Sequence, residues 1–245
     1  MIHIDASELN HRLLNDAIHS AIENGERNIV LDRVNGHRYI CAGVKSDVGM
    51  KIHGIPGNDL GAFMDGPRIE VFGNGQDAIA NTMNSGRIAI HGHAGDVLAY
   101  GMRGGELLIR NDAGYRVGIH MKAFKDLVPT IVIGGTVKDF LGEYMAGGII
   151  IVLALDSGSV PPAGFGVGSG AHGGAIYIRG RLRDEQLGKE IRKVPFTKED
   201  QLILKGKIGD FCRNFNIPKL QTILKSRFSK YVPLSHRPYG KLYAY

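Results

Sequence analysis

The stretch NTMNSGRIAIHGHAGDVLAYGMRGG, residues 81–105, begins a pattern that the chain then repeats. A short apolar strand from Ile88 to Ile90 is followed by a glycine turn, and an equivalent strand returns 19 residues later, from Leu107 to Ile109. A strand that returns after so short a loop, with the same glycine and methionine around it, is typical of successive rungs in a repeat protein.

The same period extends through most of the chain. The small residue two places after the last apolar position of each strand recurs at intervals of 19, 19, 19, 24, 19 and 26 residues. These markers are Gly54, Gly73, Gly92, Asn111, Gly135, Ala154 and Gly180. The two longer intervals contain insertions, which we place in AFKDLVP (123–129) and LDSGSVPPAGFGVGSG (155–170). Rungs of this length, stacked about 4.8 Å apart through backbone pairing, predict a β-solenoid.

Three further columns keep the same register. The apolar column is Leu60, Ile79, Leu98, Val117, Leu141 and Val167. The glycine and alanine column is Gly61, Ala80, Ala99, Gly118, Gly142 and Gly168. The methionine column is Met64, Met83, Met102, Met121 and Met145. We expect the apolar and methionine columns to fill the interior, and the small column to mark a corner where no larger side chain fits.

These observations predict an all-β core, a single-stranded right-handed parallel β-helix of about seven turns, with an N-terminal helix and a helical C-terminal tail. A left-handed hexapeptide solenoid would require 18 residues per turn, which a period of 19 breaks. We expect an N-terminal helical cap in 1–28, the β-helix in 29–180, and a basic helical extension in 181–245.

Helix signals lie on both sides of the repeat. Asp5 and Glu8 resemble a capping box, an apolar face follows that includes Leu13 and Leu14, and Gly25 is expected to stop the helix. Thr197 with Asp200 predicts the start of a second helix. Its apolar face is expected to be Leu204, Ile208, Phe211, Cys212 and Phe215, with a shorter helix near 220–228. The aromatic tail YVPLSHRPYGKLYAY is expected to pack against the body or a partner.

Charge and cysteine content narrow the class of protein. The net charge of +6 comes from residues 181–245, which carry 15 Lys and Arg but only 6 Asp and Glu. No nucleic-acid motif accompanies this basic tail, so docking on an acidic partner protein is the favoured interpretation over nucleic-acid binding. The two cysteines belong to no CxxC motif, and neither a signal peptide nor a membrane-length apolar run is evident. We expect a cytoplasmic protein with reduced thiols.

A search for chemistry favours structural interpretations. Asn58, Asp77, Asp96 and Asp139 recur in one column, which fits backbone-binding turns better than paired carboxylates for sugar hydrolysis. Histidines at 91, 93, 120 and 172 have no carboxylate or cysteine at metal-ligand spacing. GFGVGSGAHGG (164–174) precedes a strand, whereas a phosphate loop opens a helix. We therefore predict no catalytic residue, no cofactor-binding residue and no metal ligand on this chain.

The rungs also carry a family resemblance. The stretches at 54–122 and 134–153, GIPGNDLGAFM…VGIHMK and GGTVKDFLGEYMAGGIIIVL, resemble the C-terminal glycine-repeat (GXGXG) domain of the glutamate synthase large (alpha) subunit. The resemblance covers about residues 1–180, and the ending VPLSHRPYGKLYAY resembles free-standing forms of this domain. The same repeat occurs in a scaffold subunit of formylmethanofuran dehydrogenase, so a scaffold role in that enzyme remains an alternative.

The resemblance implies a domain without catalytic residues that packs between an amidotransferase and a synthase component. FMN, an iron–sulfur cluster and NADPH or ferredoxin are then implied for the partner subunits only. The sequence begins MIHID, without the amidotransferase cysteine, and shows no iron–sulfur cysteine cluster. We expect no activity from the chain alone. Self-association, a self-contained carbohydrate-active β-helix enzyme and nucleic-acid binding through the tail stay open as alternatives.

Overall fold

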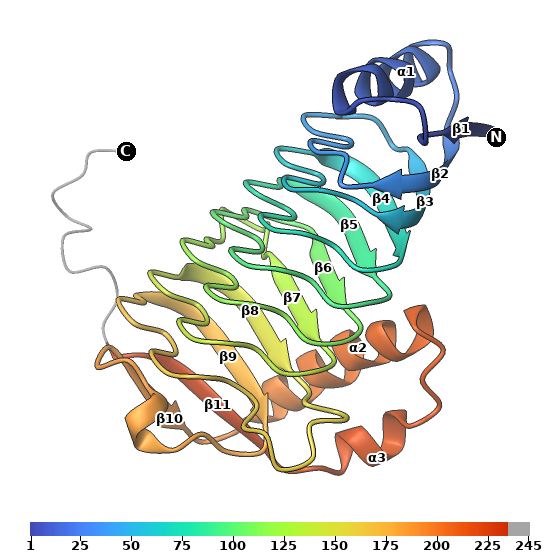
Figure 1. The fold of residues 1–245 in the computed structure, drawn as a ribbon. Coiled ribbons are helices and arrows are strands. Elements are labelled where there is room, and N and C mark those ends of the chain that lie inside the picture. Colours follow the sequence, from blue (N-terminus) through green and yellow to red (C-terminus); the bar gives the residue numbers. More distant parts are fainter. Residues whose placement is uncertain (235–245) are drawn as a thin grey trace, which may run out of the picture.

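The computed structural model describes residues 1–234 and shows a parallel β-solenoid (Figure 1). One sheet of 11 strands has the order β1-β2-β3-β4-β5-β6-β7-β8-β9-β11-β10. Strands β1 to β9 pair in parallel, whereas β11 is antiparallel to β9 and β10. The parallel strands are β1 (Ile2–Asp5), β2 (Asn28–Asn35), β3 (Gly49–Ile55), β4 (Asp65–Phe72), β5 (Ser85–Ile90), β6 (Glu106–Ile109), β7 (Thr130–Ile133), β8 (Ala146–Val152) and β9 (Gly173–Arg179).

The register of the strands confirms the predicted repeat. One line of paired residues through the stack is Ile52, Val71, Ile90, Ile109, Ile133, Val152 and Ile178. The insertions lengthen two of the connecting loops and leave this line in register. The solenoid has about six turns, compared with about seven predicted, because the seven sequence markers delimit six intervals.

The predicted interior columns are buried. Every residue of the apolar column is 0% exposed, and no residue of the methionine column is more than 1% exposed. They join the inward residues of the strands in one continuous hydrophobic cluster. Burying a side chain of this size contributes roughly 1.5–3 kcal/mol, so the stacked interior is the main source of stability.

The glycine and alanine column forms a corner with left-handed backbone. Gly118 has φ +75°, and Ala99 has φ +56° one rung earlier. Arg116 and His120, two positions before and after Gly118, also have positive φ, so left-handed residues recur at every second position of this corner. Cys41 occupies the equivalent position in the first rung with φ +61°. The small residues therefore reflect both the backbone conformation and the lack of space inside the corner.

The N-terminal end of the solenoid is closed by α1 (His11–Glu23), which lies across the end of the stack in Figure 1. The N-cap is Asn10, whose Oδ1 accepts from the backbone N–H groups of Arg12 and Leu13, so the capping box predicted at Asp5 is wrong. Residues 2–5 instead form β1, which pairs with β2. Leu14 is buried as predicted, but Leu13 is 50% exposed.

The C-terminal end contains more sheet than the sequence indicated. After β9 come a short 3₁₀ turn (Asp184–Gln186), β10 (Ile191–Val194), α2 (Lys198–Asn214), α3 (Leu220–Leu224) and β11 (Phe228–Pro233). The Thr197–Asp200 capping box of α2 is confirmed. The shorter helix is also present, although it ends at Leu224. Most of the aromatic tail, residues 235–245, lies outside the described residues.

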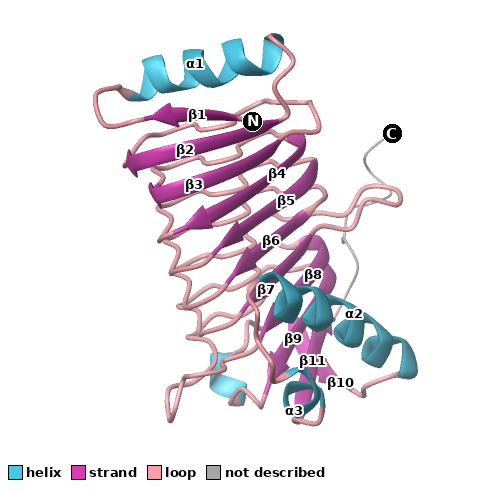
Figure 2. Cartoon of the chain, turned by 90° about the vertical axis from the view of Figure 1, so that its right-hand side faces the viewer, coloured by secondary structure: helices cyan, strands magenta, loops and turns pink. Residues whose placement is uncertain are grey.

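Helix α2 covers one half of the outer face of the sheet. Its predicted apolar residues are all buried, and together with Ile223 of α3 they pack on the outward side chains of β5 to β9. Those outward side chains are Ala89, Leu108, Val132, Ile151 and Tyr177. Figure 2 shows no helix in front of β2–β5. The outer face therefore has a covered half and an open half.

Candidate functional surface

The recurring Asn and Asp column is a ladder of hydrogen bonds between rungs. Asp77 Oδ1 accepts from the backbone N–H of Asp96 at 2.9 Å, and Asp96 Oδ1 accepts from Tyr115 N–H at 2.9 Å. Asp139 Oδ1 accepts from Phe165 N–H at 2.8 Å. Each of these carboxylates satisfies a backbone donor in the next rung, which agrees with the turn interpretation of the column.

This ladder also explains several glycines. A Cβ atom at Gly95, Gly114 or Gly164 would overlap the Oδ1 atom of the aspartate that reaches across from the preceding rung. Gly73 has a similar constraint, because its Cβ would overlap the carbonyl oxygen of Gly54. The glycine-rich turns are therefore required by close backbone approach between rungs.

The four candidate histidines lie apart in different contacts. His91 Nε2 lies 2.9 Å from Glu70 Oε1, and the ring of His120 stacks on Tyr144 with centroids 5.2 Å apart. His93 Nδ1 accepts from the backbone N–H of Asp112, and His172 Nδ1 lies 3.4 Å from the Gly170 carbonyl oxygen. Within residues 1–234, no three His, Cys, Asp or Glu side chains are grouped as a metal site would require.

The glycine-rich segment 164–174 supports packing between elements. A Cβ at Gly168 would lie 2.6 Å from Ile191 Cγ2, and Gly170 lies against the ring of Tyr144. The segment leads directly into β9, as the sequence indicated. It therefore lacks the helix N-terminus that gives a phosphate loop its converging N–H donors.

A buried polar cluster fastens α2 to the sheet. Asp200 is 2% exposed, and its Oδ1 accepts from Tyr177 Oη at 2.7 Å and from Lys230 Nζ at 2.6 Å. Burial by itself raises the pKa of Asp200, but the hydrogen bonds from Lys230, Tyr177 and Thr197 outweigh it and lower the pKa to about 2. Burial, followed by the Asp200 carboxylate, raises the pKa of Tyr177. A fully satisfied charge in this position specifies how the helix docks.

A second ion cluster lies where α2 crosses β6. Lys207 Nζ of α2 donates to Glu106 Oε1 at 2.7 Å, and Arg87 Nε of β5 donates to Glu106 Oε2 at 2.8 Å. Burial acts to raise the pKa of Glu106, but the hydrogen bonds and charges of Lys207 and Arg87 lower it overall. Arg87 therefore belongs both to this cluster and to the edge of the open half.

An aromatic row crosses the outer face toward the end of α2. The rings of His53, Phe72, His91 and Phe215 follow one another with centroid distances of 5.0, 4.7 and 4.9 Å. The first three come from β3, β4 and the residue after β5, and Phe215 is the C-cap of α2. The Phe72 ring thus packs against two histidine rings, and 39% of the residue stays exposed.

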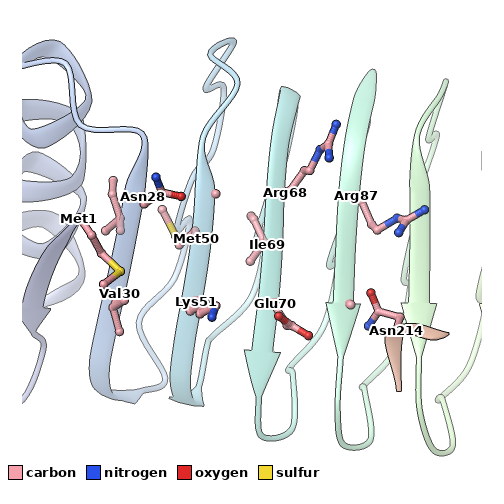
Figure 3. A pocket seen from close by; sticks show the side chains of 13 residues that line it. Met1, Asn28, Val30, Met50, Lys51, Arg68, Ile69, Glu70, Arg87 and Asn214 are labelled. Atoms are coloured by element: carbon pink, nitrogen blue, oxygen red, sulfur yellow. The ribbon is translucent and has the colours of Figure 1, made fainter. Parts of the chain in front are cut away.

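The open half contains a hollow of about 310 Å³ (Figure 3). Its floor is the outer face of β2 to β5, and Figure 3 shows Met1 at its β2 side and Asn214, the last residue of α2, at the opposite side. Three cations line it, Lys51, Arg68 and Arg87, together with the single carboxylate of Glu70. Sequence reasoning did not single out these residues, because nothing in the repeat shows which outward positions a helix will leave open.

Two further features bear on the class of protein. Cys41 and Cys212 are free and buried, and burial raises the pKa of Cys41 to about 12. Across residues 1–234, no helix has the length and hydropathy needed to cross a bilayer.

Comparison with known proteins identifies a family that is described by its glycine motif. A family model described as "GXGXG motif" matches residues 6–235, nearly the whole chain. The chain belongs to the GXGXG motif family. In this member, turn glycines such as Gly73, Gly95 and Gly114 allow the backbone and the Asp side chains of one rung to approach the next. A protein of Methanocaldococcus jannaschii, named "Uncharacterized protein MJ1350", is 55% identical over 250 residues, covering 98% of this chain and 95% of that protein.

Proposed function

We propose that this GXGXG protein is a non-catalytic structural subunit of a split glutamate synthase, which serves glutamate biosynthesis and ammonia assimilation. In this role it packs between an amidotransferase component and a synthase component. The partners carry the FMN, the iron–sulfur cluster and the site for NADPH or ferredoxin. The chain holds the two components at a fixed separation.

One observation carries the proposal: the family match spans residues 6–235, and the relative from Methanocaldococcus jannaschii is matched over 95% of its own length. Little of that relative lies outside the segment that aligns with this chain. This supports a domain that works with catalytic components carried on other chains.

The architecture suits a spacer. Stacked strands joined through backbone hydrogen bonds form a stiff body, because each rung is fixed by the rungs on both sides of it. The candidate carboxylates are occupied by backbone donors of the adjacent rung, so their geometry serves the fold. We place the protein in the cytoplasm, where its two free, buried cysteines stay reduced.

Affinity purification of the tagged full chain from its source cells tests the proposal. We expect amidotransferase and synthase chains to co-elute, with flavin absorbance and iron in the complex. The chain purified alone is expected to show no glutaminase activity, flavin absorbance or iron. Flavin bound to the isolated chain, or co-elution with the subunits of formylmethanofuran dehydrogenase instead, would contradict it.

A further inference from the structure

The open half of the outer face continues beyond the hollow shown in Figure 3. A second hollow of about 380 Å³ is lined by Gly66, Arg68, Ser85, Gly86, Arg87 and Glu106. The two hollows share Arg68 and Arg87 in their linings, so they lie next to each other, and we call the pair, which extends from β2 to β6, the depression. Its length across five strands matches an extended chain segment better than a compact small molecule.

The charges in this depression are unbalanced. Lys51 and Arg68 are exposed, and neither has an ion-pair partner among residues 1–234. Glu70 already lies against His91, and Glu106 is shared by Arg87 and Lys207. The two unpaired cations are therefore available to an incoming acidic group.

Buried apolar side chains form the floor at both ends of the charged row on β3 and β4. Val30 and Ala89 lie on the outer face on either side of the row formed by Lys51 and Glu70, and the Met1 side chain lies above β2 in Figure 3. An occupant with acidic and small apolar side chains would satisfy both the cations and this floor. Stacked bases do not fit as well, because no aromatic ring within the described part of the chain lines either hollow.

One polar atom beside the depression lacks a partner. Asn214, at the end of α2, lines the first hollow, and its buried Nδ2 has no hydrogen-bond acceptor among residues 1–234. A buried amide donor without an acceptor is destabilising. This amide is therefore a candidate donor to a carbonyl or carboxylate oxygen of an occupant.

We propose that the depression across β2 to β6 docks an acidic segment of a partner subunit, with Lys51 and Arg68 as the principal charge contacts. This inference rests on the proposed function, because it names the face through which the spacer holds one of its partners. The other half of this outer face is covered by α2 of the same chain, so the partner is expected on the open half.

The test uses the full chain co-expressed with the amidotransferase and synthase chains of its own organism. The charge-reversal variant Lys51→Glu/Arg68→Glu is compared with a matched variant, Lys122→Glu/Lys138→Glu, which reverses two exposed cations away from the depression. Affinity is measured by biolayer interferometry at about 0.05 M and about 0.5 M salt, a range over which screening of exposed charges changes strongly. Circular dichroism melting confirms that both variants fold.

We expect the depression variant to bind at least about 30-fold more weakly at low salt, with the difference shrinking at high salt, and the matched variant to bind within about threefold of wild type. Equal affinity of the depression variant and wild type would overturn the inference while leaving the proposed function intact. Absence of any complex with the wild-type chain would overturn the proposed function itself. Self-association of the wild type that the depression variant loses would assign the face to a second copy and also overturn the inference.

Discussion

Substitution of Gly118 tests the corner geometry that makes the solenoid. Gly118 has φ +75°, and an added Cβ would lie 2.6 Å from Ile150 Cδ1 and 3.4 Å from Ile131 Cδ1. The glycine and alanine column predicted that no larger side chain fits at this corner. The structure shows that the nearest atoms are interior side-chain ends from β7 and β8.

The expected loss in the free energy of unfolding has two separate contributions. A left-handed conformation costs a non-glycine residue about 1–2 kcal/mol, and Ala99 already accepts it one rung earlier. Overpacking of a filled interior adds about 1–3 kcal/mol, although the end of the Ile150 side chain can move to admit a single methyl group. We therefore expect Gly118→Ala to cost about 1–2 kcal/mol, and Gly118→Val, which is β-branched, to cost roughly 3–5 kcal/mol.

Thermal melting followed by circular dichroism measures both changes. For a chain of this size about 2–4 °C is lost per kcal/mol, so Gly118→Val should lower the Tm by roughly 6–20 °C and Gly118→Ala by a few degrees. The control is Gly206→Ala within α2, where no heavy atom lies within 4 Å of the added Cβ. This control should gain about 0.5–1 kcal/mol, because glycine is unfavourable inside a helix. A Tm for Gly118→Val within about 2 °C of wild type would refute the corner argument.

Three other predictions follow from polar and thiol groups. The pKa of Asp200 is lowered from 3.8 to about 2, so the ionised carboxylate contributes about 2 kcal/mol to the free energy of unfolding above pH 4. Urea denaturation should show that this contribution is lost as the pH falls from 4 to 2. The variant Asp200→Asn should not show this loss. Asp96→Ala should lower the free energy of unfolding by about 1–2 kcal/mol, whereas Asp96→Asn should change it little, because the amide oxygen of Asn still accepts a hydrogen bond. Equal chemical denaturation curves for Asp96→Ala and wild type would argue against the hydrogen-bond ladder between rungs. Cys41 and Cys212 should resist a thiol reagent at pH 8 until urea unfolds the chain, and rapid labelling of the native protein would contradict their burial.

The solenoid could be predicted because its constraints repeat. Every rung must place an apolar residue in the interior, a small residue at the left-handed corner and a turn glycine beside the preceding rung. The same residue types therefore recur in the sequence at a constant spacing. Chance similarity in one rung cannot imitate agreement over several. The capping box at Thr197 and Asp200 was also predictable, because it depends on four adjacent residues.

The elements at the two ends follow no such repetition. Strand β1 has four residues, and β11 returns from α3 to pair with β9 in the antiparallel direction. Each is stabilised by a neighbour distant in sequence, and a short segment carries little information about such a partner. The same reason explains the wrong cap of α1, since Asp5 became part of β1 and left Asn10 as the cap.

The division of the outer face is determined by one line of side chains across the sheet. From β5 to β9 this line is apolar, and α2 packs on it, whereas on β3 and β4 it consists of Lys51 and Glu70. Extending the helix over these two residues would remove both charges from water, at a penalty of several kcal/mol for each ion unless new partners were supplied. Helix α2 ends at Asn214, before these charges, and Asn216 with φ +53° turns the chain away from the helix. A partner with complementary acidic groups could cover the remaining strands, because it would bring the missing charges with it.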